Sequence, residues 1–227
     1  MGRKINRIMD IKEAIYARHT VRKFQDKPLA EDVVKALQAR IEKVNKEHQV
    51  NIKLVTNESV PVWGVMKFFM TKGLKNYLVL LGPDRADIEE SLGYCGIDIA
   101  LYAQTLGLNT WWVGGTYSKN SASKDVEGSV INGIIALGYG QVQGVPHKSK
   151  AFEDVCQYEG AMPEWFKQGV EAALLAPTAM NKQKFMITGK DNEVSISCDN
   201  GKWSGTDLGI VKYHFEVGAG KDNFQWK

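Results

Sequence analysis

Two long apolar segments with the spacing of buried helices constrain the fold of this 227-residue chain most strongly. Residues 88–106 repeat apolar side chains every three or four positions and stop at Gly107, which is typical of a core helix. Residues 208–220 have the same texture, with an apolar body, small residues and a final glycine. The similarity predicts a weak internal repeat, although two buried helices can also look alike by composition alone.

Shorter elements are predicted around these two segments. Asp10 has the pattern of a helix N-cap, with Glu13 completing a capping box, and Pro28 and Pro163 each precede an apolar helical stripe. The predicted strands cover residues 51–56, 77–81, 110–113, 131–137, 184–188 and 193–198, the last two as a hairpin. Since the strands do not alternate regularly with helices, the sequence predicts an α+β fold, with a mixed or antiparallel sheet flanked by helices.

Composition narrows the possible functions. The net charge is +3 and the 29 Lys and Arg residues are spread along the chain, so no nucleic-acid partner is expected. Cys95, Cys156 and Cys198 lie far apart, which indicates free thiols in a reducing compartment. No stretch is long and apolar enough for a membrane span, and residues 1–7 do not resemble a signal peptide. We therefore expect a soluble, cytoplasmic protein.

Motifs for nucleophilic or metal-dependent catalysis are missing from the sequence. There is no P-loop, HExxH or GxSxG pattern, and the four histidines share no motif. Gly138, Gly140 and Gly144 do not form a GxGxxG fingerprint, which disfavours a Rossmann dinucleotide-binding unit. If the chain is an enzyme, a cofactor supplies its chemistry.

A basic segment follows the first predicted helix. Arg18, His19, Thr20 and Arg22 place two guanidiniums, an imidazole and a hydroxyl within five residues, a donor set suited to a phosphate. The alternative is a solvated helix end, because cations favour the C-terminal end of a helix. The basic residues 147–150 either converge on the same phosphate or belong to the solvated surface.

A polar segment near the C-terminus complements the basic one. Residues 176–183 read Ala-Pro-Thr-Ala-Met-Asn-Lys-Gln. Pro177 ends a helical segment, after which Thr178 and two side-chain amides suit the polar edge of a planar heterocycle; a plain turn is the alternative. Gly114 and Gly115 at a strand end either let backbone N–H groups approach a flat ligand or form an ordinary loop.

Read in chain order, these segments resemble the nitroreductase-like FMN flavoproteins. Residues 18–24 match that family's Arg-x-Ser/Thr-x-Arg/Lys-x-Phe pattern, and residues 176–183 match its Ala-Pro-Ser-x-x-Asn-x-Gln pattern. In the family the second pattern normally lies early in the chain, whereas here it lies late. The resemblance therefore implies the branch labelled TM nitroreductases. In it residues 1–155 and a reduced second half, residues 156–227, would form an intrachain pseudo-dimer within one integrated domain.

The same resemblance implies one FMN site per chain. The expected FMN-binding residues are Arg18, His19, Thr20, Arg22, Gly114, Gly115, Lys148, Lys150, Pro177, Thr178, Ala179 and Asn181. The first three, with the two lysines, would hold the phosphate and ribityl chain. Arg22 would stabilise negative charge on the reduced flavin. No catalytic side chain and no metal are expected.

The activity implied is that of an FMN-dependent oxidoreductase. It would take hydride from NAD(P)H and reduce a nitroaromatic, a quinone or a similar small acceptor, as a monomer or weak homodimer. The alternatives are a flavin-binding carrier or redox sensor without steady turnover, and a specialised relative that dehalogenates its substrate or consumes its flavin. Residues 57–73, rich in Trp, Met and Phe, are the candidate lid or pocket segment.

Overall fold

The computed structural model describes residues 9–58, 74–115 and 129–227. Its helices are α1 (Ile11–Ala17), α2 (Glu31–His48), α4 (Ile88–Thr105), α6 (Glu164–Ala173) and α7 (Ser204–Ala219). Its strands are β1 (Lys53–Val55), β2 (Tyr77–Pro83), β3 (Asn109–Val113), β4 (Ser129–Gly138), β5 (Cys156–Glu159), β6 (Phe185–Lys190), β7 (Glu193–Cys198) and β8 (Gln225–Trp226).

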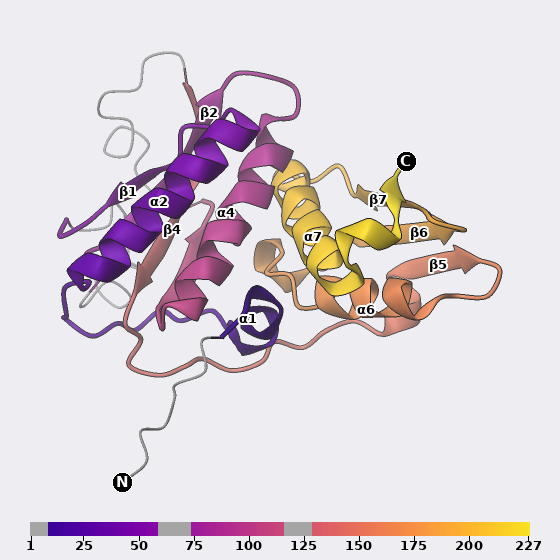
Figure 1. Cartoon of the computed structure of the whole chain (residues 1–227), viewed down its shortest axis with the longest axis horizontal. Coiled ribbons are helices and arrows are strands. Elements are labelled where there is room, and N and C mark those ends of the chain that lie inside the picture. Colours follow the sequence, from indigo (N-terminus) through magenta and orange to yellow (C-terminus); the bar gives the residue numbers. More distant parts are fainter. Residues whose placement is uncertain (1–8, 59–73, 116–128) are drawn as a thin grey trace, which may run out of the picture.

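These strands form two sheets. The first has the order β1-β2-β4-β3 and is antiparallel throughout. The second has the order β5-β6-β7-β8, with parallel pairs at both edges and the antiparallel β6-β7 hairpin in the middle. In Figure 1, α4 and α7 lie side by side between the two sheets, with α2 beside the first and α6 near the second. The predicted α+β class, with mixed and antiparallel sheets and flanking helices, is confirmed.

Local sequence signals account for most element boundaries. The amide of Glu13 donates to Asp10 Oδ1 at 2.7 Å and the amide of Asp10 donates to Glu13 Oε2 at 3.0 Å, so the predicted capping box is present. Pro163 is the N-cap of α6. The strands β5 and β8 were not predicted, because they are short and each adds in parallel to a strand that is distant in sequence. The predicted lid segment lies, apart from its first two residues, outside the described residues.

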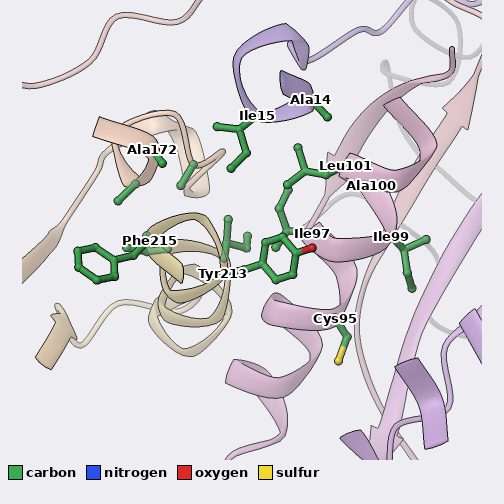
Figure 2. Packing of buried hydrophobic residues seen from close by; sticks show 14 of the residues in the cluster. Ala14, Ile15, Cys95, Ile97, Ile99, Ala100, Leu101, Ala172, Tyr213 and Phe215 are labelled. Atoms are coloured by element: carbon green, nitrogen blue, oxygen red, sulfur yellow. The ribbon is translucent and has the colours of Figure 1, made fainter. Parts of the chain in front are cut away.

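One hydrophobic cluster joins elements from both ends of the chain. Figure 2 shows side chains of α1, α4, α6 and α7 gathered around the central helices. Ile15, Ile97 and Phe215 are all buried in this cluster. The division at residues 155 and 156 stays a prediction, since the cluster includes residues from both sides of it.

The contact between α4 and α7 is close and reciprocal. A Cβ atom added to Gly93 would lie 2.2 Å from the carbonyl oxygen of Thr206, and one added to Gly209 would lie 2.0 Å from that of Glu90. Each glycine is the sixth residue of its helix, and each contacted carbonyl belongs to the third residue of the other helix. Such an exchange of equivalent contacts is what a two-fold axis between two helices produces.

Candidate cofactor site

The basic segment after α1 runs in an extended conformation beside the first sheet. The amide of Val21 donates to the carbonyl of Thr110 at 3.1 Å, and the amide of Gln25 donates to that of Tyr139 at 2.8 Å. Val21 and Phe24 are buried beneath the segment. These anchors, one on β3 and one just after β4, fix the positions of the intervening residues.

The loop that contains Gly144 lies against the basic segment. Gly144 has a φ of +79°, a left-handed value that favours glycine. A Cβ atom here would lie 2.7 Å from the Cβ of His19. The chain that continues from Gly144 to His147 therefore lies directly against the basic residues.

The polar segment after α6 is held in an unusual backbone conformation. Met180, Asn181 and Gln183 have φ values of 52°, 54° and 47°, which non-glycine residues adopt rarely and which often mark functional sites. The hydroxyl of Thr178 accepts from the amide of Gln183 at 3.0 Å. The side-chain amide of Asn181 donates to the carbonyl of Lys148 at 2.8 Å, which ties this segment to the chain after His147.

Gln183 has a structural role in this arrangement. It is 1% exposed, its side-chain nitrogen donates to the carbonyl of Leu174 at 2.7 Å, and its side-chain oxygen accepts from the amide of Lys150 at 2.7 Å. Both polar atoms are therefore used within the chain, and Gln183 fixes the segment rather than facing a ligand.

The N-terminal part of α7 supplies a third wall. The Asp207 carboxylate accepts from the amide of Ala179 with both oxygens, at 2.9 and 3.1 Å. The hydroxyl of Thr206 accepts from the side-chain amide of Asn132 at 2.7 Å, which links α7 to a bulge in β4. Helix α7 thereby touches both the polar segment and the first sheet.

Together these walls enclose a cavity of about 640 Å³, within the usual size range of small-molecule sites. Ten of the twelve residues predicted to bind a cofactor line it: Arg18, His19, Thr20, Arg22, Gly114, Gly115, Pro177, Thr178, Ala179 and Asn181. The other lining residues within the described ranges are Trp111, Trp112, Val145, Pro146, His147, Met180, Trp203, Thr206, Asp207 and Ile210. Two segments far apart in the sequence thus face one cavity.

Lys148 and Lys150 are not among the lining residues. Both are exposed, and their main-chain groups are held by Asn181 and Gln183. His147 is the residue of this basic segment that reaches the cavity, with its Nε2 atom 2.9 Å from the carbonyl oxygen of Leu174.

One end of the cavity is basic and lacks a compensating contact. Arg18 is 6% exposed, its Nε atom has no hydrogen-bond partner among the described residues, and burial lowers its pKa to about 10. Burial also lowers the pKa of His19, with smaller contributions from the charges of Arg18 and His147. Because a buried guanidinium is costly without a partner, this end favours an anionic group such as a phosphate.

His214 lies behind this basic end as a packed residue. It is fully buried, its Nδ1 atom lies 2.9 Å from the carbonyl oxygen of Ile210, and its Nε2 atom has no partner within the part of the chain that the structure describes. Burial, with the charge of Arg18 as a smaller contribution, lowers its pKa to about 3. The imidazole is therefore neutral at physiological pH.

The other end of the cavity is aromatic and carries a carboxyl group. A Cβ atom on Gly114 would lie 3.1 Å from the indole nitrogen of Trp203, so this glycine makes room for the tryptophan as well as for a ligand. Burial is the main cause that raises the pKa of Asp207 to about 6; the hydrogen bond from the Ala179 amide opposes this shift, and the charge of Asp199 makes a smaller contribution in its favour. Arg22 lies 5.8 Å from the Trp111 ring.

The two ends are arranged along α7. Asp207 and His214 are seven residues apart on the helix, which corresponds to about 10 Å. The donor set at the Arg18 end and the indole rings at the Trp203 end therefore fit a molecule with an anionic tail and a planar aromatic head, as FMN has. Sequence reasoning missed Asp207 and Trp203, whose only signal was their place at the start of a predicted core helix.

The described part of the chain also bears on two other kinds of site, a metal site and a membrane span. No group of three or more His, Cys, Asp or Glu side chains there could hold a metal ion. None of the helices in the same ranges combines the length and hydropathy that crossing a bilayer requires.

Comparisons with known proteins place this geometry in a family. The chain is similar to the solved structure of a "putative nitroreductase" from Thermotoga maritima, with 24% identity and a TM-score of 0.69, covering 98% of this chain and 90% of the other. A Desulfovibrio desulfuricans "putative nitroreductase in complex with FMN" has 14% identity and a TM-score of 0.52, with 67% and 98% covered.

A third solved structure is described as "Putative NADH dehydrogenase/NAD(P)H nitroreductase" from Bacteroides thetaiotaomicron. It has 15% identity and a TM-score of 0.53, with 64% of this chain and 95% of the other covered. A comparison with curated proteins gave no match. Residues 10–219 match the family described as "Putative TM nitroreductase", and the chain therefore belongs to that nitroreductase family.

Proposed function

We propose that this protein is an FMN-dependent oxidoreductase that takes hydride from NAD(P)H and passes the electrons to a small acceptor such as a nitroaromatic or a quinone. Membership of a nitroreductase family supports a flavin oxidoreductase in general terms. Two structures of similar fold were solved with FMN, and another is described as an NAD(P)H nitroreductase. The observation that carries the proposal is Arg18, buried at one end of an aromatic cavity with an unpartnered Nε atom.

The residues divide naturally between the two ends of FMN. Arg18, His19 and Thr20 would hold the phosphate and ribityl chain, with His147 as a further donor from the facing segment. Lys148 and Lys150 would add positive charge from outside the wall. When bound, FMN would supply the hydride-accepting chemistry for which the chain has no side-chain nucleophile or metal motif.

The ring end would be bounded by two walls. Gly114 and Gly115 lie on one wall, and Pro177, Thr178, Ala179 and Asn181 lie on the other. Arg22 is exposed at the cavity wall, where its charge would stabilise negative charge on a reduced flavin.

One chain supplies both walls, so we propose one FMN per chain, bound between residues 1–155 and residues 156–227 as in a pseudo-dimer. The protein would then need no partner subunit to complete the site, and a monomer or a weak homodimer would be active. We expect it to work in the cytoplasm, without a membrane or nucleic-acid partner.

Flavin binding and turnover test the proposal directly. Purified protein should show a flavin absorption spectrum, or acquire one on addition of FMN, with one FMN released per chain. With FMN bound, NAD(P)H should be oxidised steadily when a quinone is added. A protein that binds FMN without such turnover would be a carrier or a sensor, and one that ignores FMN would contradict the whole proposal.

Two arginine variants test the division of roles. Arg18→Ala should weaken FMN binding by about 30-fold, because a charge-assisted contact to the phosphate is lost, with little effect on flavin reduction at saturating FMN. Arg22→Ala should slow flavin reduction more than it weakens binding. Lys43→Ala, which removes an exposed cation of α2, is the matched control and should change neither; equal losses in both arginine variants would argue against separate roles.

A further inference from the structure

Asp207 is the one carboxyl group that lines the cavity among the described residues. It is the fourth residue of α7 and stands at the aromatic end, with Trp203 one turn before it and Ile210 one turn after it on the cavity wall. The cationic residues of the cavity, by contrast, come from the basic segment and from His147. A half-buried carboxyl group at the ring end of a site for an anionic cofactor needs a chemical explanation.

The contacts of Asp207 leave it free to exchange a proton. In the described part of the chain its hydrogen-bond donor is the Ala179 amide, which is shared between the two carboxylate oxygens. A single N–H can be satisfied by one oxygen, so the other oxygen can carry a proton without loss of the link to Ala179. No Lys or Arg forms an ion pair with Asp207 in the described part of the chain within 4.0 Å, so no adjacent cation holds it in the charged form.

We propose that Asp207 is the proton donor for reduction of the acceptor in this cavity. The inference rests on the proposed function, which supplies the reduced flavin as the source of hydride. For a quinone, the acceptor takes the hydride and one proton. The O–H bond of the Asp207 carboxyl breaks, a new O–H bond forms on the acceptor oxygen, and the carboxylate then regains a proton from solvent at the cavity mouth.

The titration of Asp207 suits this task. Its raised pKa, about 6, brings the acid and base forms into exchange near neutral pH. The titratable and charged groups around it are Asp199 and Cys198 at the end of β7, Glu89 of α4 beside Gly205, and the cavity residues Arg18, His19, Arg22 and His147. Sequence reasoning expected no catalytic side chain, and Asp207 departs from that expectation.

An Asp207→Asn variant separates proton donation from support of the polar segment. Asparagine keeps an oxygen that can accept from the Ala179 amide, so FMN affinity should stay within about threefold of wild type. Rapid-mixing measurements should show flavin reduction by NAD(P)H nearly unchanged and quinone reduction about 100-fold slower, a typical loss for a missing general acid. The wild-type rate of quinone reduction should fall as pH rises above about 6, and this fall should be absent in the variant.

A spectroscopic readout does not depend on turnover. The infrared difference spectrum of the flavin-free protein between acid and neutral pH should contain the carbonyl band of a protonated carboxyl group that Asp207→Asn removes. Glu89→Gln is the matched control, because Glu89 is an exposed carboxylate near the start of α7 and outside the cavity wall. It should leave the rates and the pH profile within twofold of wild type.

The outcomes are distinguishable. If Asp207→Asn reduces quinone as fast as wild type with the same pH profile while Asp207→Ala loses FMN affinity, Asp207 only positions the polar segment and the inference is overturned. If wild-type protein binds no FMN, the proposed function fails and the inference falls with it. Slow quinone reduction with intact FMN binding and intact flavin reduction supports both.

Discussion

The central helices α4 and α7 meet through equivalent glycines, yet the buried polar side chains at equivalent positions further along the two helices differ in whether they have hydrogen-bond partners. The eleventh residue of α4 is Asp98, which accepts two hydrogen bonds from Arg40 at 2.6 and 2.7 Å. The eleventh residue of α7 is His214, whose Nε2 atom has no partner, and the nearby Arg18 also has an unpartnered Nε atom. The buried charge on the α4 side is thus compensated within the chain, whereas on the α7 side buried nitrogen atoms of Arg18 and His214 have no hydrogen-bond partner among the described residues.

The seventh residues of α4 and α7 also differ in whether the side chain has hydrogen-bond partners within the chain. Tyr94 of α4 donates its hydroxyl hydrogen to Glu216, which also pairs with Lys221 at 2.7 Å and accepts from the indole of Trp226 at 2.9 Å. Ile210 of α7, at the matching position, lines the cavity. On the α4 side, the Tyr94 ring and its hydrogen-bond network fill the space, whereas on the α7 side the aliphatic side chain of Ile210 borders the cavity. This difference supports one cofactor site per chain.

The largest effect should come from the contact that the two sides share. In Gly93→Ala and Gly209→Ala, the added methyl group overlaps sterically with a backbone carbonyl of the other helix. A backbone carbonyl cannot move aside as the end of a side chain could. We expect each to lower the free energy of unfolding by about 3 kcal/mol, measured by urea denaturation. Gly201→Ala, in an exposed loop before α7, is the control and should cost less than about 1 kcal/mol; a large cost at only one helical glycine would break the equivalence.

A second pair of variants sharpens the contrast in charge. Arg40→Met leaves Asp98 largely buried without its partner, and we expect a loss of about 2 kcal/mol, discounted because the Arg40 side chain is partly exposed. Arg18→Met removes a buried cation that has no compensating contact at Nε, so the flavin-free protein should be unchanged or more stable by up to about 1 kcal/mol. Urea denaturation of both flavin-free variants decides the matter, and destabilisation by Arg18→Met would show that Arg18 serves the fold.

The site residues that the sequence predicted differ from those that it missed in how local their signals are. Arg18 and Thr178 were predicted because each belongs to a short pattern whose backbone is fixed locally, after a helix end or after Pro177. Lys148 was predicted from its charge and from the family resemblance, but its side chain is exposed while Asn181 binds its carbonyl. Asp207 went unnoticed because its contact in the cavity wall is with Ala179, which is 28 positions away.

For the helices too, the sequence predicted local features but not long-range contacts. Residues 88–106 were predicted almost to the boundary, because helical periodicity is a local signal. The reciprocal contact of Gly93 and Gly209 was not, since a glycine inside a helix does not reveal which backbone approaches it. Local pattern therefore predicted most of the elements and the two cavity-facing segments, and long-range contacts decided which side chains face the cavity.

The pH dependence of stability should also differ between the two sides. The pKa of His214 is lowered to about 3 in the folded protein, against an ordinary value near 6.5. Between these two pH values, the imidazole is therefore protonated in the unfolded chain and neutral in the folded protein. Stability attributable to His214 is present above about pH 6.5 and is lost as pH falls, by about 2 kcal/mol between pH 7 and pH 5. His214→Gln should remove this part of the slope in urea titrations, and parallel curves for variant and wild type would contradict the assignment.

The smallest effect concerns the fourth residues, Ser91 of α4 and Asp207 of α7. Ser91 is uncharged and accepts from Arg85 at 2.9 Å, whereas the pKa of Asp207 is raised to about 6. The protonated Asp207 is the form that the folded state favours, so its contribution to stability is complete below about pH 4 and is lost as pH rises through 6. Asp207→Asn should therefore stabilise the flavin-free protein by about 1 kcal/mol at pH 8, after allowance for its partial exposure, and the gain should vanish near pH 4. A chain that keeps an ionisable group here at a cost to its stability uses that group for something other than folding, and a variant with no gain at pH 8 would remove this argument.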